Sequence, residues 1–311
     1  MTSIRFPALA FCAALLPALA AGAPAYAESS SLTGKLNAYV GCLNRLSERA
    51  YLARERYFSW VGKKGPTGKE RIIYGTYTIY DTSECKSEVE IANMLDPRNG
   101  ELEHAASAYV DAVVAIEPLL KEADDYYSQE DYKDDKMAKG KALHPKLVAA
   151  WTAFADADTK LRSSIDVIQD MLAVEELVNI ESTEGRKARY HIQALMMHAK
   201  RLVRVQNTDK PDLKKITETL GEYEAMTKAT ETYADENKDD KIGSSFINSA
   251  KTFLITSKQL MRRLRDKVPY STGEEMILNS GGGAWMVEGS PGRLMHDYNQ
   301  LVDSYNRGAR F

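Results

Sequence analysis

The chain has 311 residues, with 41 lysines and arginines against 44 aspartates and glutamates, so its net charge of −3 is close to neutral. Hydrophobic residues make up 44% of the chain and charged residues 27%. These values are typical of a folded globular protein and exclude a disordered or collagen-like chain. A dedicated nucleic-acid-binding protein would carry a net basic charge, so we expect no nucleic-acid partner.

The first 27 residues have the pattern of a secretory signal peptide. A single charge, Arg5, precedes an apolar stretch over residues 6–21, and residues 25–27 supply the small-x-small cleavage site. We therefore predict cleavage after Ala27 and a periplasmic product without a transmembrane segment. The product is not expected to be a lipoprotein, because Cys12 follows Phe11, where a lipoprotein signal has a small residue.

Cleavage leaves two of the three cysteines, Cys42 and Cys85, in the mature chain. An even number of cysteines in an exported protein favours a disulfide over metal or redox chemistry. The two form no Cys-x-x-Cys motif, which excludes a thioredoxin-like function. We predict a Cys42–Cys85 disulfide, and the alternative is a pair of buried free thiols.

Apolar residues recur at alternating steps of three and four along most of the mature chain. One series covers residues 32–60, a second covers residues 102–127, and shorter series follow up to residue 305, with Asp158 as a polar interruption. This spacing places one apolar stripe on each helix and calls for partner helices nearly parallel or antiparallel to it. Turn residues separate the series, so we predict an all-α fold, an elongated multi-helix bundle with heptad-type packing.

One segment departs from the helical pattern. Residues 62–68 are rich in glycine, and residues 72–80 are rich in β-branched and aromatic side chains. We predict an extended or hairpin insertion over about residues 62–84, ending near Cys85. The whole mature chain, residues 28–311, is predicted to form a single helical domain.

Several short motifs resemble the YiiG-like family of bacterial exported proteins. They are Gly65-Pro66-Thr67-Gly68, Tyr74-Gly75-Thr76-Tyr77, and a block between Tyr126 and His144 that includes Asp131-Tyr132-Lys133-Asp134-Asp135. The resemblance covers nearly all of the mature chain and implies a helical cell-envelope domain of unknown function. Some members of the family are lipoproteins, and this chain departs from them. Because the family has no assigned chemistry, the resemblance implies no catalytic residue and no cofactor.

The most distinctive block supplies the candidate site residues, which are Tyr126, Tyr127, Asp131, Tyr132, Asp134, Asp135 and His144. In one interpretation they form a helix corner, with Ser128 and Asp131 as a capping box and tyrosine hydroxyls on carboxylates. In the other, the same acids form a cation or ligand site. We favour the corner, because caps explain the spacing and the block lacks the pattern of a calcium loop.

Three other clusters have plain structural interpretations. His191 and His198 share a helical face but lack the i, i+4 spacing of a zinc helix, so they are interpreted as bundle histidines. Residues 235–246 begin like an EF-hand loop but have Asp240 and Phe246 where glycine and glutamate are required, so we predict an acidic interhelical loop. The basic residues at 262–267 suit the C-terminus of a helix.

These observations favour a non-enzymatic binding or interaction module of the cell envelope, with an envelope protein or polymer as its partner. Two alternatives stay open: an envelope hydrolase acting on peptidoglycan or other glycans, and a divalent-cation-binding protein. Converging carboxylates from different helices in a cleft would favour the hydrolase. The sequence contains no nucleophile elbow, phosphate-binding loop or dinucleotide fingerprint.

Overall fold

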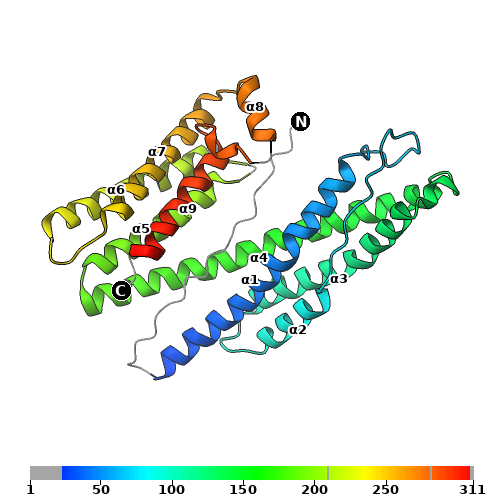
Figure 1. Ribbon diagram of the computed structural model, residues 1–311. Helices are drawn as coiled ribbons and strands as arrows, with labels where there is room; N and C mark the ends of the chain where they lie inside the picture. The colour runs from blue at the N-terminus through cyan, green and yellow to red at the C-terminus, as the bar shows by residue number, and fades with distance from the viewer. Residues whose placement is uncertain (1–22, 209, 281, 309–311) are drawn as a thin grey trace. The chain divides into compact units, whose positions relative to one another are not determined.

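The computed structural model describes residues 23–208, 210–280 and 282–308, and every regular element in them is a helix (Figure 1). The prediction of an all-α, multi-helix fold is therefore confirmed. The described residues form two compact units, unit 1 up to residue 168 and unit 2 from residue 169, and the boundary between them falls within α4 (Ala138–Glu184). Residues 1–22, most of the predicted signal peptide, lie outside the described residues. None of the described helices is both long enough and apolar enough to cross a membrane.

The buried faces of unit 1 follow the two long heptad series. Its elements are α1 (Ala23–Phe58), α2 (Thr82–Asn93), α3 (Gly100–Ser128), the short 3-10 helix η1 (Asp131–Lys133) and the first part of α4. The series residues Leu36, Tyr39, Leu43, Leu46, Ala50, Ala53 and Tyr57 of α1, and Leu102, Ala106, Tyr109, Val113, Ile116, Leu120, Ala123 and Tyr127 of α3, are at most 5% exposed. Helix α2 packs against both α1 and α3. The predicted heptad-type packing therefore holds in this unit.

A buried hydrogen-bond network accounts for the polar residue that interrupts the apolar series. Asp158 of α4 accepts a hydrogen bond from Ser47 Oγ of α1 at 2.5 Å and another from Arg162 Nε at 2.9 Å. Ser47 Oγ also lies 2.9 Å from the hydroxyl of Tyr109 in α3. The network joins three helices, and it satisfies a carboxylate whose burial would otherwise be costly.

The connection between α1 and α2 is extended. Residues 59–81 contain neither helix nor strand, so the predicted insertion takes its extended form, and it ends where α2 begins at Thr82. Across residues 66–80, all of which the structure describes, no hydrogen bond joins two backbone groups. The hairpin alternative is wrong, because a hairpin would require a ladder of such bonds.

Unit 2 packs four helices around one apolar core. Its elements after α4 are α5 (Ala188–Gln206), α6 (Leu213–Glu236), α7 (Ser244–Asp266), α8 (Thr272–Asn279), η2 (Ala284–Met286) and α9 (Pro291–Gly308). The core includes Leu195, Leu202, Tyr223, Phe246, Phe253, Leu260, Leu294 and Leu301 from α5, α6, α7 and α9. The acidic segment is the loop between α6 and α7, as predicted, and Asp240 in it accepts a hydrogen bond from the backbone N–H of Ala188 at 2.9 Å. This carboxylate therefore caps α5.

Candidate functional site

The candidate residues lie around the corner at which α3 leads into α4. Asp135 accepts hydrogen bonds from the backbone N–H groups of Ala138 at 3.1 Å and Lys139 at 2.8 Å, so it caps the start of α4. The hydroxyl of Tyr126 donates to the same carboxylate at 2.8 Å. These bonds, led by the one from the Lys139 backbone, hold the pKa of Asp135 below its ordinary value. The prediction that a tyrosine hydroxyl reaches a carboxylate is confirmed here.

The predicted capping box of Ser128 and Asp131 is wrong. Asp131 begins η1, which has no side-chain cap, and Ser128 Oγ donates back to the carbonyl of Asp125 within α3. The chain makes a longer turn than expected, in which Glu130, Lys136 and Met137 all have positive φ angles of 54–67°. That turn moves the start of α4 toward the C-terminus, so a later aspartate becomes its cap.

The remaining candidate residues divide into a buried and an exposed set. Tyr127 packs edge-on against Trp60, with ring centroids 5.0 Å apart. His144 is buried, and its Nδ1 lies 3.0 Å from the hydroxyl of Tyr57, whose pKa burial raises to about 12. Tyr132 is half-buried, while Asp131 and Asp134 face solvent. The structure thus places Tyr127 and His144 in one aromatic cluster with Tyr57, and it leaves these two aspartates outside.

The segment that follows α1 packs closely against this corner at two glycines. A Cβ atom added to Gly65 would lie 3.0 Å from the ring of His144, and one added to Gly75 would lie 3.3 Å from Cβ of Tyr127. Both glycines also have positive φ angles, 95° and 67°, that favour glycine. The separate motifs on which the resemblance rested therefore meet in space. This contact is not predicted from the sequence, in which the two glycines are its only sign.

Beyond this contact, the extended segment is fixed along α1 by side-chain hydrogen bonds. Trp60 Nε1 donates to the carbonyl of Gly75 at 2.8 Å, and Arg56 Nε donates to the carbonyl of Tyr74 at 3.0 Å. Thr76 Oγ1 donates to the carbonyl of Ala53 in α1 at 3.0 Å. The segment is thereby ordered without forming a strand.

The outer side of the segment carries three exposed tyrosines, Tyr74, Tyr77 and Tyr80, which we call the tyrosine row. Their exposed fractions are 46%, 48% and 53%, unusually high for three neighbouring aromatic side chains. The guanidinium of Arg56 lies 5.5 Å from the ring centroid of Tyr74 and 4.7 Å from that of Tyr77. That of Arg49 lies 3.9 Å from the ring centroid of Tyr80. Each ring of the row therefore has an arginine within cation–π distance.

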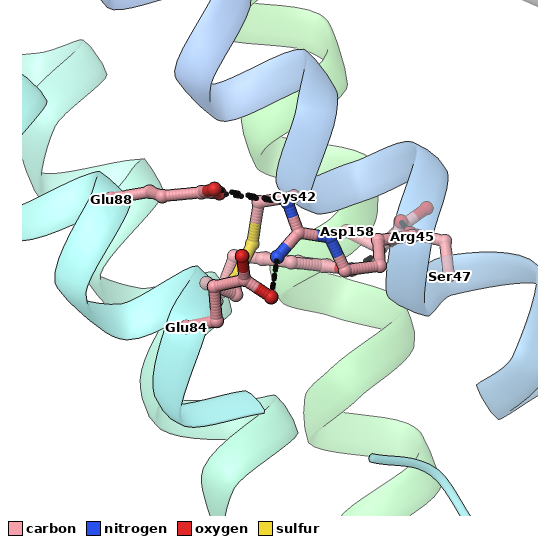
Figure 2. Close-up of a disulfide and its surroundings, with 8 residues drawn as sticks. Cys42, Arg45, Ser47, Glu84, Glu88 and Asp158 are labelled. Carbon is pink, nitrogen blue, oxygen red and sulfur yellow. Dashed lines mark hydrogen bonds and ion pairs between the residues drawn. A yellow bond between two sulfur atoms is a disulfide. The ribbon is translucent and has the colours of Figure 1, made fainter. Parts of the chain in front are cut away.

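The predicted cysteine pair lies at the far end of the extended segment (Figure 2). Cys42 of α1 and Cys85 of α2 are fully buried, at disulfide distance, with Cα atoms 5.2 Å apart. Beside them, Arg45 of α1 bridges Glu84 at 2.8 Å and Glu88 at 3.0 Å, both on α2. The cysteine pair and the ion pairs together link α2 to α1.

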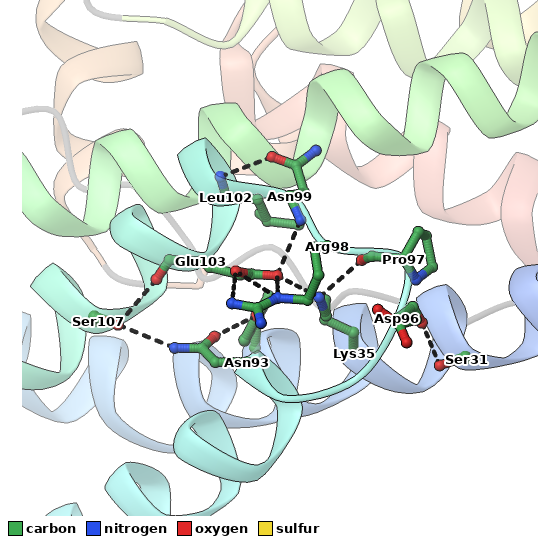
Figure 3. A network of polar contacts seen from close by, with 11 residues as sticks. Ser31, Lys35, Asn93, Asp96, Pro97, Arg98, Asn99, Leu102, Glu103 and Ser107 are labelled. Atoms are coloured by element: carbon green, nitrogen blue, oxygen red, sulfur yellow. Dashed lines mark hydrogen bonds and ion pairs between the residues drawn. The ribbon is translucent and has the colours of Figure 1, made fainter.

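A second polar cluster ties the turn between α2 and α3 to α1 (Figure 3). The fully buried Lys35 donates to Glu103 Oε1 at 2.6 Å and to the carbonyl of Pro97 at 2.9 Å. Arg98 donates to Glu103 Oε2 through Nη2 at 2.8 Å, and the backbone N–H of Asn99 donates to Oε1 at 2.9 Å. These donors, Arg98 first, lower the pKa of Glu103 to about 2. Because every group has a partner, the cluster is structural in character.

His191 and His198, both in unit 2, have separate partners. His191 stacks on Tyr233 with ring centroids 4.5 Å apart, whereas His198 Nδ1 lies 3.5 Å from a carboxylate oxygen of Glu222. Burial lowers the pKa of both histidines. In the part of the chain that the structure describes, no three His, Cys, Asp or Glu side chains gather closely enough to hold a metal ion.

A polar groove of about 470 Å³ also lies between α7 and α9. It is lined by Ser244, Ser245, Asn248, Ser249, Thr252, Asp297 and Gln300. Asp297 is its one carboxylate, and it is buried and bonded to Thr256 Oγ1 at 2.5 Å and to Arg293 Nε at 2.9 Å. The lining therefore lacks the second carboxylate that a glycosidase of the usual kind requires.

Comparison with known proteins places both units in one family. Residues 30–307 match the family described as "Protein of unknown function (DUF3829)". The chain is also 36% identical, over 289 residues, to the "Uncharacterized protein YiiG" of Escherichia coli (strain K12), a match that covers 91% of this chain and 81% of that protein. No solved structure matches the chain. The resemblance to the YiiG-like family is confirmed, and the chain belongs to this DUF3829 family of proteins of unknown function.

Proposed function

We propose that the chain is an exported binding module of the cell envelope and that the tyrosine row is its docking surface. The observation that carries the proposal is the row itself, three half-exposed rings with arginines beside them on one ordered segment. Tyrosine and arginine are the residue types that most often dominate binding at protein surfaces. A monomeric surface seldom exposes such a row without a partner.

The way in which the row is held supports a binding function. The segment is bonded to α1 at Tyr74 and Thr76 and to Trp60, just after α1, at Gly75, and the cysteine pair lies close to its end. A surface that is already ordered loses little conformational entropy when a partner docks. The row is therefore built as a preformed platform, in contrast to a loop that folds on binding.

Two features support an envelope location. The N-terminal 27 residues have the charge, apolar run and small residues of a secretory signal. A disulfide between Cys42 and Cys85 would form and persist in an oxidising compartment such as the periplasm. The intact mass of protein released from the periplasm tests this part: we expect a chain that begins at Glu28, whereas a retained leader or an added lipid would contradict it.

The docking function is tested by cross-linking in cells that express the tagged full chain. The variant Tyr74→Ser/Tyr77→Ser/Tyr80→Ser removes the row, and Tyr190→Ser is the matched control, because Arg186 lies 5.2 Å from the Tyr190 ring centroid in unit 2. We expect wild type and Tyr190→Ser to be cross-linked to the same envelope component and the triple variant to lose it. Equal capture by a folded triple variant would show that the row is not the docking surface.

A further inference from the structure

We infer that the tyrosine row, together with the basic loop that precedes it, binds a linear anionic glycan. The basic loop is defined by Lys63, Lys64, Lys69 and Arg71, all exposed. This inference rests on the proposed docking function of the row and names the chemical class of its ligand. Two independent observations carry it, the spacing of the rings and the distribution of unpaired charge.

The rings repeat every third residue along an extended backbone. Tyr74, Tyr77 and Tyr80 face outward, while Thr76 and Ile79 are each 3% exposed, and Thr76 is bonded to Ala53 of α1. The backbone is extended but not a regular polyproline II helix over the whole row, because Gly75, between Tyr74 and Tyr77, has a positive φ of 67°. The row therefore presents three outward rings in succession on one ordered segment, which suits an extended ligand whose own rings repeat, such as a linear polysaccharide.

The connection over residues 59–81 is itself positive, with four basic side chains against two acids, although the whole chain carries −3. None of the four basic-loop side chains has an ion pair or a side-chain hydrogen bond with another described residue. The two acids of the same stretch are both engaged. The Glu70 carboxylate accepts bonds from the backbone N–H groups of Thr67 at 2.5 Å and Gly68 at 2.7 Å, and Asp81 lies 3.6 Å from Arg49. The surface therefore attracts anions.

The two observations together select the ligand class. A neutral glycan would use the rings but leave the cations unpaired, and a flexible polyanion without rings would use the cations but not the row. An anionic glycan uses both, since the C–H faces of sugars stack on aromatic rings and its acidic groups pair with lysine and arginine. An anionic bilayer fits less well, because the guanidinium groups of Arg49 and Arg56 lie within cation–π distance of the same three rings that would have to insert.

The test measures binding of the full mature chain by calorimetry. The probes are oligogalacturonates of three and twelve units, a neutral cello-oligosaccharide, polyaspartate and vesicles of phosphatidylglycerol. The variants are the triple row variant, the loop variant Lys63→Gln/Lys64→Gln/Lys69→Gln/Arg71→Gln, and the control Tyr190→Ser. Far-UV circular dichroism and the melting temperature establish that each variant is folded.

We expect the twelve-unit oligogalacturonate to bind at least about tenfold more tightly than the three-unit one, because only the longer spans the row. The triple row variant and the loop variant should each bind the twelve-unit oligogalacturonate at least about tenfold more weakly than wild type, and the control Tyr190→Ser should bind it equally well. If polyaspartate binds as tightly as the twelve-unit oligogalacturonate, the surface is a charge patch without a preference for sugars. If the vesicles bind more tightly than that oligogalacturonate, the surface is a membrane-binding one. Either result overturns the glycan inference.

The outcome is separable from that of the docking proposal. If no glycan probe binds while cross-linking in cells still depends on the row, the glycan inference fails and the docking function stands. If the row variant changes neither measurement, both fail.

Discussion

The ammonium group of Lys35 lies 2.6 Å from Oε1 of Glu103, and both side chains are buried. The same carboxylate also binds Arg98, but the Arg98 side chain is 63% exposed whereas that of Lys35 is fully buried. One acid therefore neutralises two cations in very different surroundings. The buried charge of Lys35 depends on Glu103, because water cannot reach Lys35 to replace the carboxylate.

Loss of the Glu103 charge is therefore expected to destabilise unit 1 strongly. Glu103→Gln leaves a buried lysine without its counter-ion, and breaking a buried pair in this way typically lowers the free energy of unfolding by about 3–5 kcal/mol. Arg98→Gln removes only the exposed partner and should change stability far less. Urea unfolding of the two variants compares them directly, and an equal loss would show that Lys35 does not depend on Glu103.

The cysteine pair is expected to stabilise the α1–α2 connection. In the chain-entropy model, closing a loop of this size contributes about 3–4 kcal/mol, so Cys42→Ser/Cys85→Ser should lower the free energy of unfolding by that amount. Chemical reduction of the wild type should have the same effect. Denatured mature protein should show no reactive thiol before reduction, and two equivalents of reactive thiol without reductant would mean that no bridge exists.

The cap of α4 is expected to depend on Asp135. Asp135→Ala removes the acceptor of two backbone N–H groups and of the Tyr126 hydroxyl, so it should lower the melting temperature clearly. Asp131→Ala is the matched control four positions earlier and should have little effect. The comparison is made with and without calcium. A rise in melting temperature on adding calcium, lost in Asp135→Ala, would instead favour a metal site at the corner.

His191 and His198 predict a loss of stability of the folded chain in mild acid. Burial lowers the pKa of His191 and His198 in the folded state, so below about pH 6.5 the unfolded chain binds more protons than the folded one. The free energy of unfolding should therefore decrease as the pH falls from about 7 to about 5. His191→Phe/His198→Gln should flatten this decrease, which denaturant unfolding across the pH range would measure. If stability falls as steeply with pH in the double variant as in wild type, these two histidines do not cause the loss.

The heptad residues of α1 and α3 could be predicted because burial on one face of a helix imposes its own period on the sequence. Leu36, Val113 and Leu120 are buried for that reason. Helix α2 could not be predicted in this way. The β-rich composition continues up to Tyr80, and the start of the helix follows Asp81, a residue with a left-handed φ of 68°.

The corner illustrates a different limit. Its tyrosines and acids are distinctive in the sequence, but the choice of Asp135 as the cap depends on a turn in which three non-glycine residues have positive φ angles. Nothing local in those residues signals that conformation. The contact of Gly65 with His144 is also non-local, so only the folded chain shows which motifs meet.

A disulfide between Cys42 and Cys85 would have a consequence for proteolysis. The exposed lysines and Arg71 of the basic loop are ready sites for a trypsin-like protease, and they all lie inside the loop that the two cysteines close. A cut there would divide the backbone but release no fragment, because α1 and α2 would stay covalently joined. The nicked chain would migrate as two pieces on a gel only after reduction, and it would keep its helices packed until then.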